Sequence, residues 1–396
     1  MVQPTPPQST HPALFNLGFR PFFSGASIFA AITMAYWLNI YLGGRPLNIV
    51  GLSPFQWHAH EMIYGYSLAV IAGFLLTAVK NWTGQHMPQG ATLVGIFSLW
   101  LAARVTLLVD AISIEIAAFF DLAFILTLIV AIARPIIITK QWRQLAILSK
   151  LVLLGSGNLL FYLGAMGYSE SGIHLAIYGG LYLVIGLILT IGRRVIPFFV
   201  ERGVGYPVQL YNSRWIDVSS LLFFLTFFVS ELFLQLPWLS RLAAGAMFVI
   251  TTARIIGWYT PGIWKIPLLW SLYIALGFID LGFILFATQQ WTSISPYLAI
   301  HAFAVGGIGV ITMGMMARVS IGHTGRDLHS LPWLVPYCFA LLVLGAVFRV
   351  LLPAIFEQHY ALWIALSGGC WILGFTLFAF AILPILSRQR PDKTYG

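Results

Sequence analysis

Charged side chains are scarce in this chain. Asp, Glu, Lys and Arg make up 8% of its 396 residues, whereas soluble domains carry about 25%. Hydrophobic residues make up 59%, and the mean hydropathy is +0.89. A folded chain of this composition could not cover its surface with polar groups. The composition therefore excludes a soluble protein and predicts that most side chains face lipid or other helices.

Cysteine is nearly absent as well. Cys338 and Cys370 are the only two, and each lies in an apolar run. An iron–sulfur cluster needs more cysteine ligands than this, and the spacing is incompatible with a CxxC pair. The sequence therefore excludes a disulfide framework, an iron–sulfur cluster and a CxxC redox motif.

Long apolar segments are what the sequence has in abundance. A helix of roughly 20 apolar residues crosses the hydrocarbon core of a bilayer. Such segments recur along the whole chain and leave no stretch for a soluble domain. We predict an all-α integral membrane protein with about twelve helices in one polytopic domain. The expected spans are 22–42, 57–80, 91–109, 114–134, 145–165, 172–193, 215–234, 238–257, 266–288, 297–318, 332–352 and 361–386.

Positive charge is distributed unevenly between the loops. Most of the 21 Lys and Arg residues fall on the side that carries both termini, while Arg45 and Arg241 fall on the other. Cytoplasmic loops are enriched in Lys and Arg, so we expect both termini in the cytoplasm of a multi-pass protein of the bacterial inner membrane. The net charge of +9 then reflects the enrichment of Lys and Arg in the cytoplasmic loops, and no nucleic-acid partner is expected.

Parts of the sequence repeat. The second and tenth spans share a histidine that is followed at identical offsets by Gly and by Thr-Gly, and an Arg-Val pair lies in the span after each. The sixth span, with His174, matches more loosely, and a chance likeness is the alternative there. We predict three pseudo-equivalent four-helix blocks, at 15–134, 145–257 and 266–386. The matched residues are His60, Gly73, Thr83 and Gly84, with His301, Gly314, Thr324 and Gly325.

Ionisable residues inside the predicted spans gather in one layer. Such residues are costly in a bilayer and mark functional sites. With the termini inside, the histidines of the second, sixth and tenth spans lie at the outer ends of their helices. Several arginines and carboxylates lie in the outer halves of theirs. The layer contains His58, His60, Glu61, Arg104, Asp121, His174, Glu231, Asp280, His301 and Arg349.

Helix geometry separates the roles of these residues. Successive residues turn by ~100°, so His58 and His60 point to nearly opposite faces and cannot easily bind one metal together. Haem iron takes axial histidines from two helices, and haem propionates need cationic partners. The repeat-related His60 and His301 meet the first requirement. Arg104 and Arg349 meet the second.

The same residues have structural alternatives. A histidine in an apolar helix can be a hydrogen-bonded core residue that binds no ligand. Arg104 and Arg349 could form ion pairs with a neighbouring carboxylate such as Asp110 or Glu115. Repeat equivalence favours ligation for the two histidines, and both interpretations of the arginines stay open.

Four short motifs follow one another along the chain. A chain with these motifs resembles the NnrS family, and the resemblance covers most of its length. It implies a membrane protein that contains haem and copper and takes part in the nitric oxide response. The motifs are Gly18-Phe19-Arg20-Pro21-Phe22-Phe23, Trp57-His58-Ala59-His60-Glu61-Met62, Gly73-Phe74-Leu75-Leu76-Thr77 running into Asn81-Trp82-Thr83-Gly84, and Ala317-Arg318-Val319-Ser320 with Gly322-His323-Thr324-Gly325-Arg326.

A more distant likeness is to the catalytic subunit of haem-copper oxidases and nitric oxide reductases, which has twelve helices in three arcs. Its low-spin haem takes histidines from helices two and ten, and helix six supplies a ligand to the second metal. By helix number alone, His60 and His301 would take the first role and His174 the second. This is a likeness of fold only. The adjacent His-His pair and the His-Pro-Glu motif are absent, which puts an identical binuclear copper site in doubt.

These observations favour a protein with one or two haem b groups, and copper as an optional second metal, that reduces nitric oxide near the outer face. The alternatives are a haem sensor or scavenger without turnover, and a secondary transporter without a cofactor. Nitric oxide, an electron donor and the lipid bilayer are the expected partners. Glu61, Asp121, Asp280 and Glu231 are the candidates for a proton relay. His58 and His174 are candidate ligands of a second haem or a copper ion. Tyr64 is expected to contact the haem, in addition to the residues named above.

Overall fold

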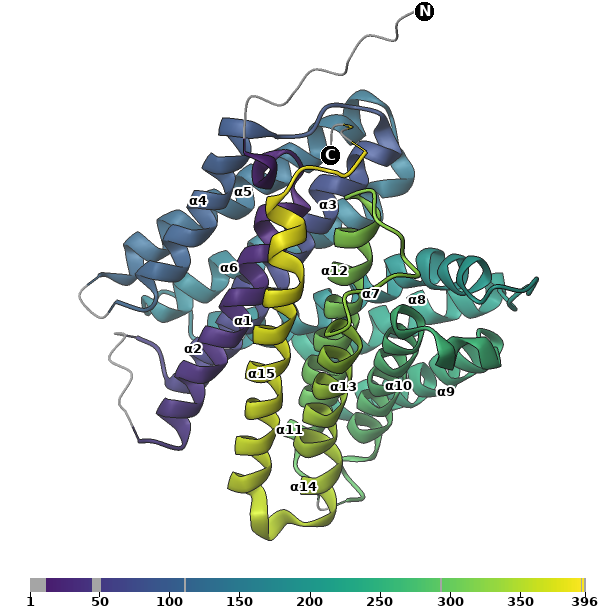
Figure 1. The fold of residues 1–396 in the computed structure, drawn as a ribbon. Helices are drawn as coiled ribbons and strands as arrows, with labels where there is room; N and C mark the ends of the chain where they lie inside the picture. The colour runs from purple at the N-terminus through teal and green to yellow at the C-terminus, as the bar shows by residue number, and fades with distance from the viewer. Residues whose placement is uncertain (1–11, 45–50, 110–111, 293, 393, 395–396) are drawn as a thin grey trace, which may run out of the picture. The chain divides into compact units, whose positions relative to one another are not determined.

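Every regular element in the described part of the chain is a helix, and no strand occurs there. Figure 1 shows the helices in chain order, from purple to yellow. Arg45 and Asp110, which entered the sequence interpretation, lie outside the described residues. The computed structural model describes residues 12–44, 51–109, 112–292, 294–392 and 394.

The prediction of a multi-pass membrane protein is confirmed. Eleven helical segments of the described chain are long and apolar enough to cross a membrane, and they agree with eleven predicted spans. The predicted span 91–109 corresponds to α4 (Gly90–Thr106), which is apolar but has only 17 residues. The eleven segments are Phe19–Tyr41, Pro54–Thr83, Ile114–Ile138, Trp142–Ala165, Gly172–Gly203, Arg214–Leu234, Pro237–Gly257, Pro267–Thr288, Pro296–Gly322, Val335–Ile355 and Glu357–Ser387.

The spans are built from the following elements. The first half contains α1 (Phe19–Tyr41), α2 (Pro54–His60), η2 (Glu61–Ser67), α3 (Leu68–Thr83), α4 (Gly90–Thr106), α5 (Ile114–Ile138), α6 (Leu145–Ala165) and α7 (Gly172–Gly203). The second half contains α8 (Arg214–Val229), η4 (Ser230–Leu234), α9 (Pro237–Gly257), α10 (Pro267–Thr288), α11 (Pro296–His301), η6 (Ala302–Gly309), α12 (Val310–Gly322), α13 (Val335–Ala346), η7 (Val347–Leu351), α14 (Leu352–Ile355) and α15 (Tyr360–Ser387).

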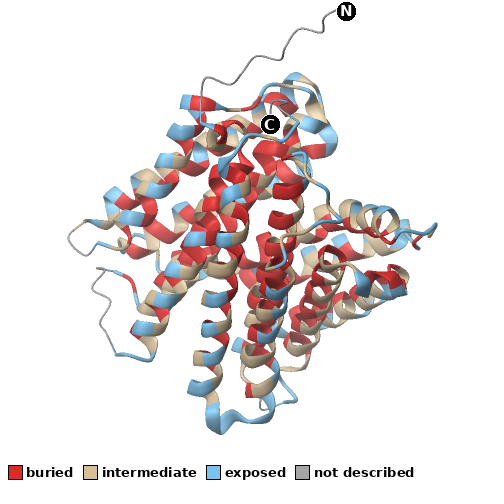
Figure 2. Ribbon diagram, in the orientation of Figure 1, coloured by how far each residue is buried: buried red, intermediate tan, exposed pale blue. Residues whose placement is uncertain are grey.

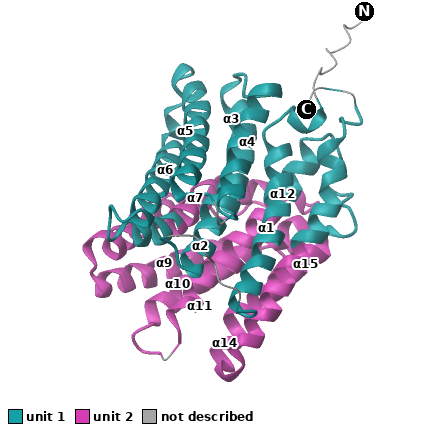
Figure 3. Ribbon diagram, turned by 90° about the vertical axis from the view of Figure 1, so that its left-hand side faces the viewer, with its two compact units in different colours: residues 1–180, 316–335, 375–396 teal, residues 181–315, 336–374 magenta. Residues whose placement is uncertain are grey.

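The chain forms two compact units, which Figure 3 shows in different colours. Helices α7, α12, α13 and α15 each contribute residues to both units. The three predicted four-helix blocks stay a prediction. Unit 1 comprises Met1–Gly180, Met316–Val335 and Phe375–Gly396, and unit 2 comprises Leu181–Met315 and Pro336–Gly374.

Many large apolar residues are exposed. Figure 2 colours all exposed residues pale blue along the ribbon. On α5, Phe119 is 66% exposed, Leu126 61% and Val130 57%. In water, contiguous apolar surface of this kind would cause association. In a bilayer it faces hydrocarbon at no such cost, because lipid tails are as apolar as the side chains. The exposed faces therefore agree with the membrane assignment.

Among the described residues, four segments are π-helical, namely η2, η4, η6 and η7. Such segments are rare and occur frequently at functional sites. His60 is the last residue of α2 and is followed directly by η2. His301 is the last residue of α11 and is followed directly by η6. The two repeat-related histidines therefore share the same local position.

The shared Thr-Gly pairs end the helices that follow. Gly84 has φ +67° and Gly325 has φ +70°, the left-handed conformation that glycine adopts without steric cost. The hydroxyl groups of Thr83 and Thr324 each donate to the carbonyl oxygen four residues earlier, at 2.7 and 2.6 Å. The repeated Thr-Gly pair thus has a local structural cause in both places.

The motif around Arg20 ties α1 to the C-terminal end of α15 within unit 1. Arg20 is fully buried, and its Nη1 donates to the carbonyl oxygen of Leu386 at 2.6 Å and to that of Arg388 at 2.8 Å. The last carbonyl groups of a helix lack partners within the helix and carry partial negative charge. Arg20 therefore supplies hydrogen bonds to carbonyl groups at the C-terminal end of α15 that have no partner within the helix.

Candidate functional site

Six polar side chains of unit 1 form one buried network, which we call the His60 cluster. They come from α2, η2, α4, α5 and α6. All six are at most 1% exposed, although every one of these helices is apolar. Buried polar groups in a membrane must satisfy one another, because no water is present to do so. The members are His60, Glu61, Arg104, Asp121, Asn158 and Tyr162.

His60 has a partner at each ring nitrogen. Nδ1 lies 2.9 Å from Glu61 Oε1, and Nε2 lies 2.9 Å from Asn158 Oδ1. Nε2 is also 3.5 Å from Asp121 Oδ2. All three partner atoms accept hydrogen bonds, so an imidazole that satisfies them carries a proton on both nitrogens. The ring stacks on Phe161, with centroids 4.0 Å apart, which fixes its plane.

Arg104 lies between the two carboxylates. Its Nη1 is 2.5 Å from Glu61 Oε1, and its Nη2 is 2.5 Å from Asp121 Oδ1. Gly65 makes room for the guanidinium group, because a Cβ at this position would lie 3.0 Å from Nη1. Tyr162 donates its hydroxyl proton to Asp121 Oδ2 at 2.9 Å. The ion-pair alternative therefore holds for Arg104, with Glu61 and Asp121 as partners instead of Glu115.

The charges of the His60 cluster balance in one protonation state. Arg104 contributes one positive charge, and the two carboxylates contribute two negative charges. When His60 carries both ring protons, the net charge is zero. A net charge in hydrocarbon costs several kcal/mol, whereas a compensated group of charges is tolerated. The arrangement thus brings proton donors and acceptors into contact inside the membrane.

Tyr64, the predicted haem contact, is held by neighbouring helices of the same unit. Its hydroxyl donates to the carbonyl oxygen of Ala176 at 2.8 Å. A Cβ at Gly157 would lie 2.6 Å from this hydroxyl oxygen, and one at Gly180 would lie 2.7 Å from it. The two glycines therefore make the space that the tyrosine fills.

His301 of unit 2 has a different set of partners from His60. Its Nδ1 lies 2.7 Å from the carbonyl oxygen of Tyr297, so Nδ1 carries the proton and donates. Nε2 then bears the lone pair, and it accepts from Arg349 Nη2 at 3.2 Å. A histidine that ligates a metal usually donates its other ring N–H to a carbonyl or carboxylate. The Nδ1–H bond of His301 therefore fits an axial ligand of haem, and ligation by Nε2 would require the Arg349 side chain to move away from that nitrogen.

His60 differs from His301 in having side-chain partners at both ring nitrogens. Ligation by Nε2 would require that nitrogen to leave Asn158 Oδ1 and Asp121 Oδ2, two buried groups that would lose this partner. In the arrangement described, His60 fits a proton-holding role. Ligation of haem by His60 stays a prediction.

The further candidate ligands, His58 and His174, have aromatic neighbours. His58 stacks on Trp37 with ring centroids 4.4 Å apart, and the His174 ring lies 4.6 Å from that of Tyr178. Among the residues that the structure describes, no group of three or more His, Cys, Asp or Glu side chains is arranged to hold a metal ion. A copper site stays a prediction.

Asp280 of unit 2 is also separate from the His60 cluster in its contacts. It is 7% exposed, and Oδ2 accepts from the Thr252 hydroxyl at 2.7 Å. Oδ1 has no hydrogen-bond partner among the described residues. Glu231 lies half-buried in η4. Of the four predicted proton-relay residues, the structure brings Glu61 and Asp121 together around Arg104.

Sequence reasoning missed Asn158 and Tyr162. A signal was present, because both are polar groups in the apolar helix α6 and lie four residues apart, on one face. What the pattern lacked was any indication of which neighbouring helix this face contacts. Asp121 was identified as ionisable, but its partner Arg104 could not be assigned for the same reason.

Comparison with known proteins identifies the family of this chain. A comparison with curated proteins found no match. The family described as NnrS protein matches residues 13–390, nearly the whole chain, as the four sequence motifs indicate. This membership suggests a role in the nitric oxide response. The multi-pass membrane protein described here belongs to the NnrS family.

Proposed function

We propose that this chain binds haem b and reduces nitric oxide to nitrous oxide. The observation that supports the proposal is the His60 cluster, a group of proton donors and acceptors that is buried among membrane helices. Ionisable groups at such positions are costly and mark functional sites by default. Because the family has a role in the nitric oxide response, we infer that nitric oxide is the substrate.

The stoichiometry explains the need for the cluster. Two nitric oxide molecules, two electrons and two protons give one nitrous oxide and one water. Nitric oxide is apolar and enters from lipid without a polar path, whereas protons require carriers. Glu61, His60 and Asp121 follow one another at 2.9 and 3.5 Å. A proton can pass between adjacent members without leaving the network.

Haem ligation is assigned to His301, whose Nδ1 has the carbonyl partner typical of a ligating histidine, and Arg349 would leave Nε2 and act as the cation beside the haem. When bound, the haem would supply a redox-active iron that takes nitric oxide and electrons from a donor. The chain's own residues would then have two roles, cofactor binding and proton transfer. His301 and Arg349 hold the cofactor, while His60, Glu61 and Asp121 hold and move protons.

The experiment separates these two roles. The full-length protein is purified in detergent, reduced and exposed to nitric oxide, and its absorption spectrum and the nitrous oxide in the headspace are measured. We expect His301→Ala to lose the haem spectrum. We expect Glu61→Gln to keep the spectrum and lose most of the nitrous oxide. Glu170→Gln, in an exposed loop, is the matched control and should change neither.

The absorption spectrum and nitrous oxide production of the wild-type protein distinguish the possible functions. Haem without nitrous oxide would favour a sensor or scavenger. A colourless protein would overturn both haem functions and leave the secondary transporter. Loss of the haem spectrum in His60→Phe, with His301→Ala unchanged, would reverse the assignment of the two histidines.

A further inference from the structure

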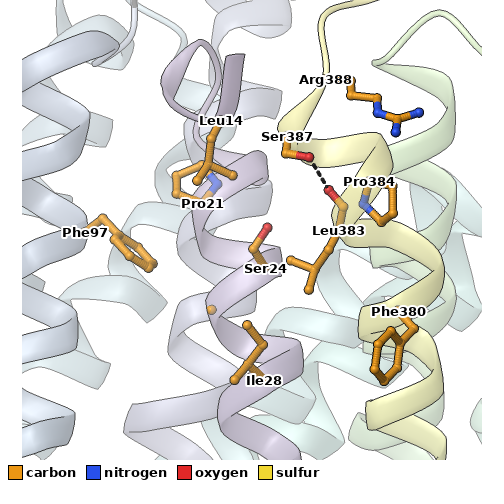
Figure 4. Close-up of a pocket in the computed structure, with 11 residues that line it drawn as sticks. Leu14, Pro21, Ser24, Ile28, Phe97, Phe380, Leu383, Pro384, Ser387 and Arg388 are labelled. Carbon is orange, nitrogen blue, oxygen red and sulfur yellow. Dashed lines mark hydrogen bonds between the residues drawn. The ribbon is translucent and has the colours of Figure 1, made fainter. Parts of the chain in front are cut away.

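A groove of about 630 Å³ opens between helices of unit 1. Its walls come from α1, α4 and the last turns of α15, and the segment before α1 contributes Leu14 (Figure 4). Ile28 and Phe380 line one end, while Ser387 and Arg388 line the other. From Phe380 to Ser387 the helix rises by about 10 Å, at 1.5 Å per residue. The groove is therefore long enough for a chain of several methylene groups.

The interior of the groove offers no free hydrogen-bond donor. Its two hydroxyl groups belong to Ser24 and Ser387, and Figure 4 shows Ser387 bonded within its own helix. Ser24 donates to the carbonyl oxygen of Arg20 at 2.7 Å, and Ser387 donates to that of Leu383 at 2.8 Å. A polar ligand placed inside would lose its hydrogen bonds to water without replacement. The interior therefore suits an apolar chain.

The mouth of the groove is positively charged. Arg388 lines the groove there and is exposed, and it forms no ion pair among the described residues. Arg390, two residues further along, is in contrast paired with Asp392 at 2.6 Å. Arg388 thus lacks an anion that the described chain could supply.

We propose that this groove binds an acyl chain of an anionic phospholipid and that Arg388 contacts its phosphate headgroup. The apolar interior matches the acyl chain, and the unbalanced cation matches the headgroup charge. Basic pockets between helices at the cytoplasmic side of membrane proteins bind anionic headgroups, and both termini are predicted to lie on that side. The proposal is independent of the reaction proposed above.

The test compares two headgroups on the same acyl chains. Delipidated full-length protein in detergent is titrated with phosphatidylglycerol or phosphatidylcholine, and bound lipid is counted by native mass spectrometry. We expect wild type to bind phosphatidylglycerol roughly fivefold more tightly. Arg388→Gln should reduce this affinity to that for phosphatidylcholine. Ile28→Trp, which fills the groove, should weaken both lipids.

Ile32→Trp is the matched control for Ile28→Trp. It lies one turn further along α1, is 54% exposed and does not line the groove, so lipid binding should be unchanged. Equal affinity of wild type for the two lipids would overturn the headgroup assignment. Equal effects of the two tryptophans would overturn the groove as the site. Isolation of the protein with a bound quinone that Ile28→Trp removes would overturn the occupant.

Discussion

Arg104 on α4 and Asp121 on α5 form an ion pair of 2.5 Å between Nη2 and Oδ1, and both side chains are buried. Two neighbouring helices of unit 1 are thus joined by opposite charges in an apolar surrounding. An ion pair of this kind contributes little beyond its desolvation cost while it is intact, but breaking it leaves a buried charge without a partner. The consequences can be measured.

Replacement of Arg104 by glutamine should be strongly destabilising. Glu61 and Asp121 would both lose their cation, and breaking a buried pair costs about 3–5 kcal/mol. Thermal unfolding in detergent measures the change. Arg241→Gln removes an arginine that hydrogen-bonds Gln290 at an exposed position, where the change should stay within about 0.5 kcal/mol. Equal losses in the two variants would contradict the buried network.

Asp121→Asn and Asp280→Asn should behave differently. Asp121→Asn breaks an ion pair and should lower the free energy of unfolding by several kcal/mol. Asp280 has the Thr252 hydroxyl as a donor, and its Oδ1 has no partner among the described residues. Asp280→Asn should therefore change stability by no more than about 1 kcal/mol. A large loss in Asp280→Asn would indicate a charge partner for this carboxyl group.

Gly157→Ala and Gly180→Ala should each cost about 1–3 kcal/mol, because the new methyl group meets the Tyr64 hydroxyl at 2.6 or 2.7 Å. In a Tyr64→Phe background the same substitutions should cost less, since the hydroxyl oxygen is gone. A double-mutant cycle measures this coupling. Gly95→Ala on α4 is the control, because a Cβ there meets nothing within 4 Å. Additive effects would rule out the close contact.

His323 should make unit 1 less stable in mild acid. Burial, together with the charges of Arg390 and Lys80, lowers the pKa of His323 below its ordinary value of 6.5. As the pH falls through 6.5, the unfolded chain binds a proton that the folded chain does not, so stability is lost. The melting temperature should fall from about pH 7.5 to about pH 5.5, and fall less in His323→Gln. Identical slopes would contradict the assignment.

The membrane spans were predictable because hydropathy acts on each segment separately. A run of apolar residues is inserted as a helix whatever its neighbours are. The two Thr-Gly pairs that the sequence repeats prove to be helix ends, since a left-handed glycine and a hydroxyl bond to the preceding turn are local features. The three-block repeat itself stays a prediction. The shortness of α4 is local as well, but hydropathy does not mark helix ends within a few residues.

The partners within the site were not predictable. A helical pattern shows that Asn158 and Tyr162 share a face, but it does not show that this face meets His60 and Asp121. The same limit left Arg104 with Asp110 or Glu115 as candidate partners. The histidines at the two matched positions differ for a further reason. Glu61 follows His60 while Ala302 follows His301, so only His60 has a carboxylate next to it.

The sequence by itself determined that this chain lies in a membrane, where its helices run, which family it belongs to and which ionisable residues are candidates for chemistry. The tertiary structure alone decided which of those residues touch. Hydrophobicity and helix termination depend on neighbours along the chain. A hydrogen bond or ion pair between helices depends on side-chain packing across tens of residues, as with His60 and Asn158, whose atoms lie 2.9 Å apart.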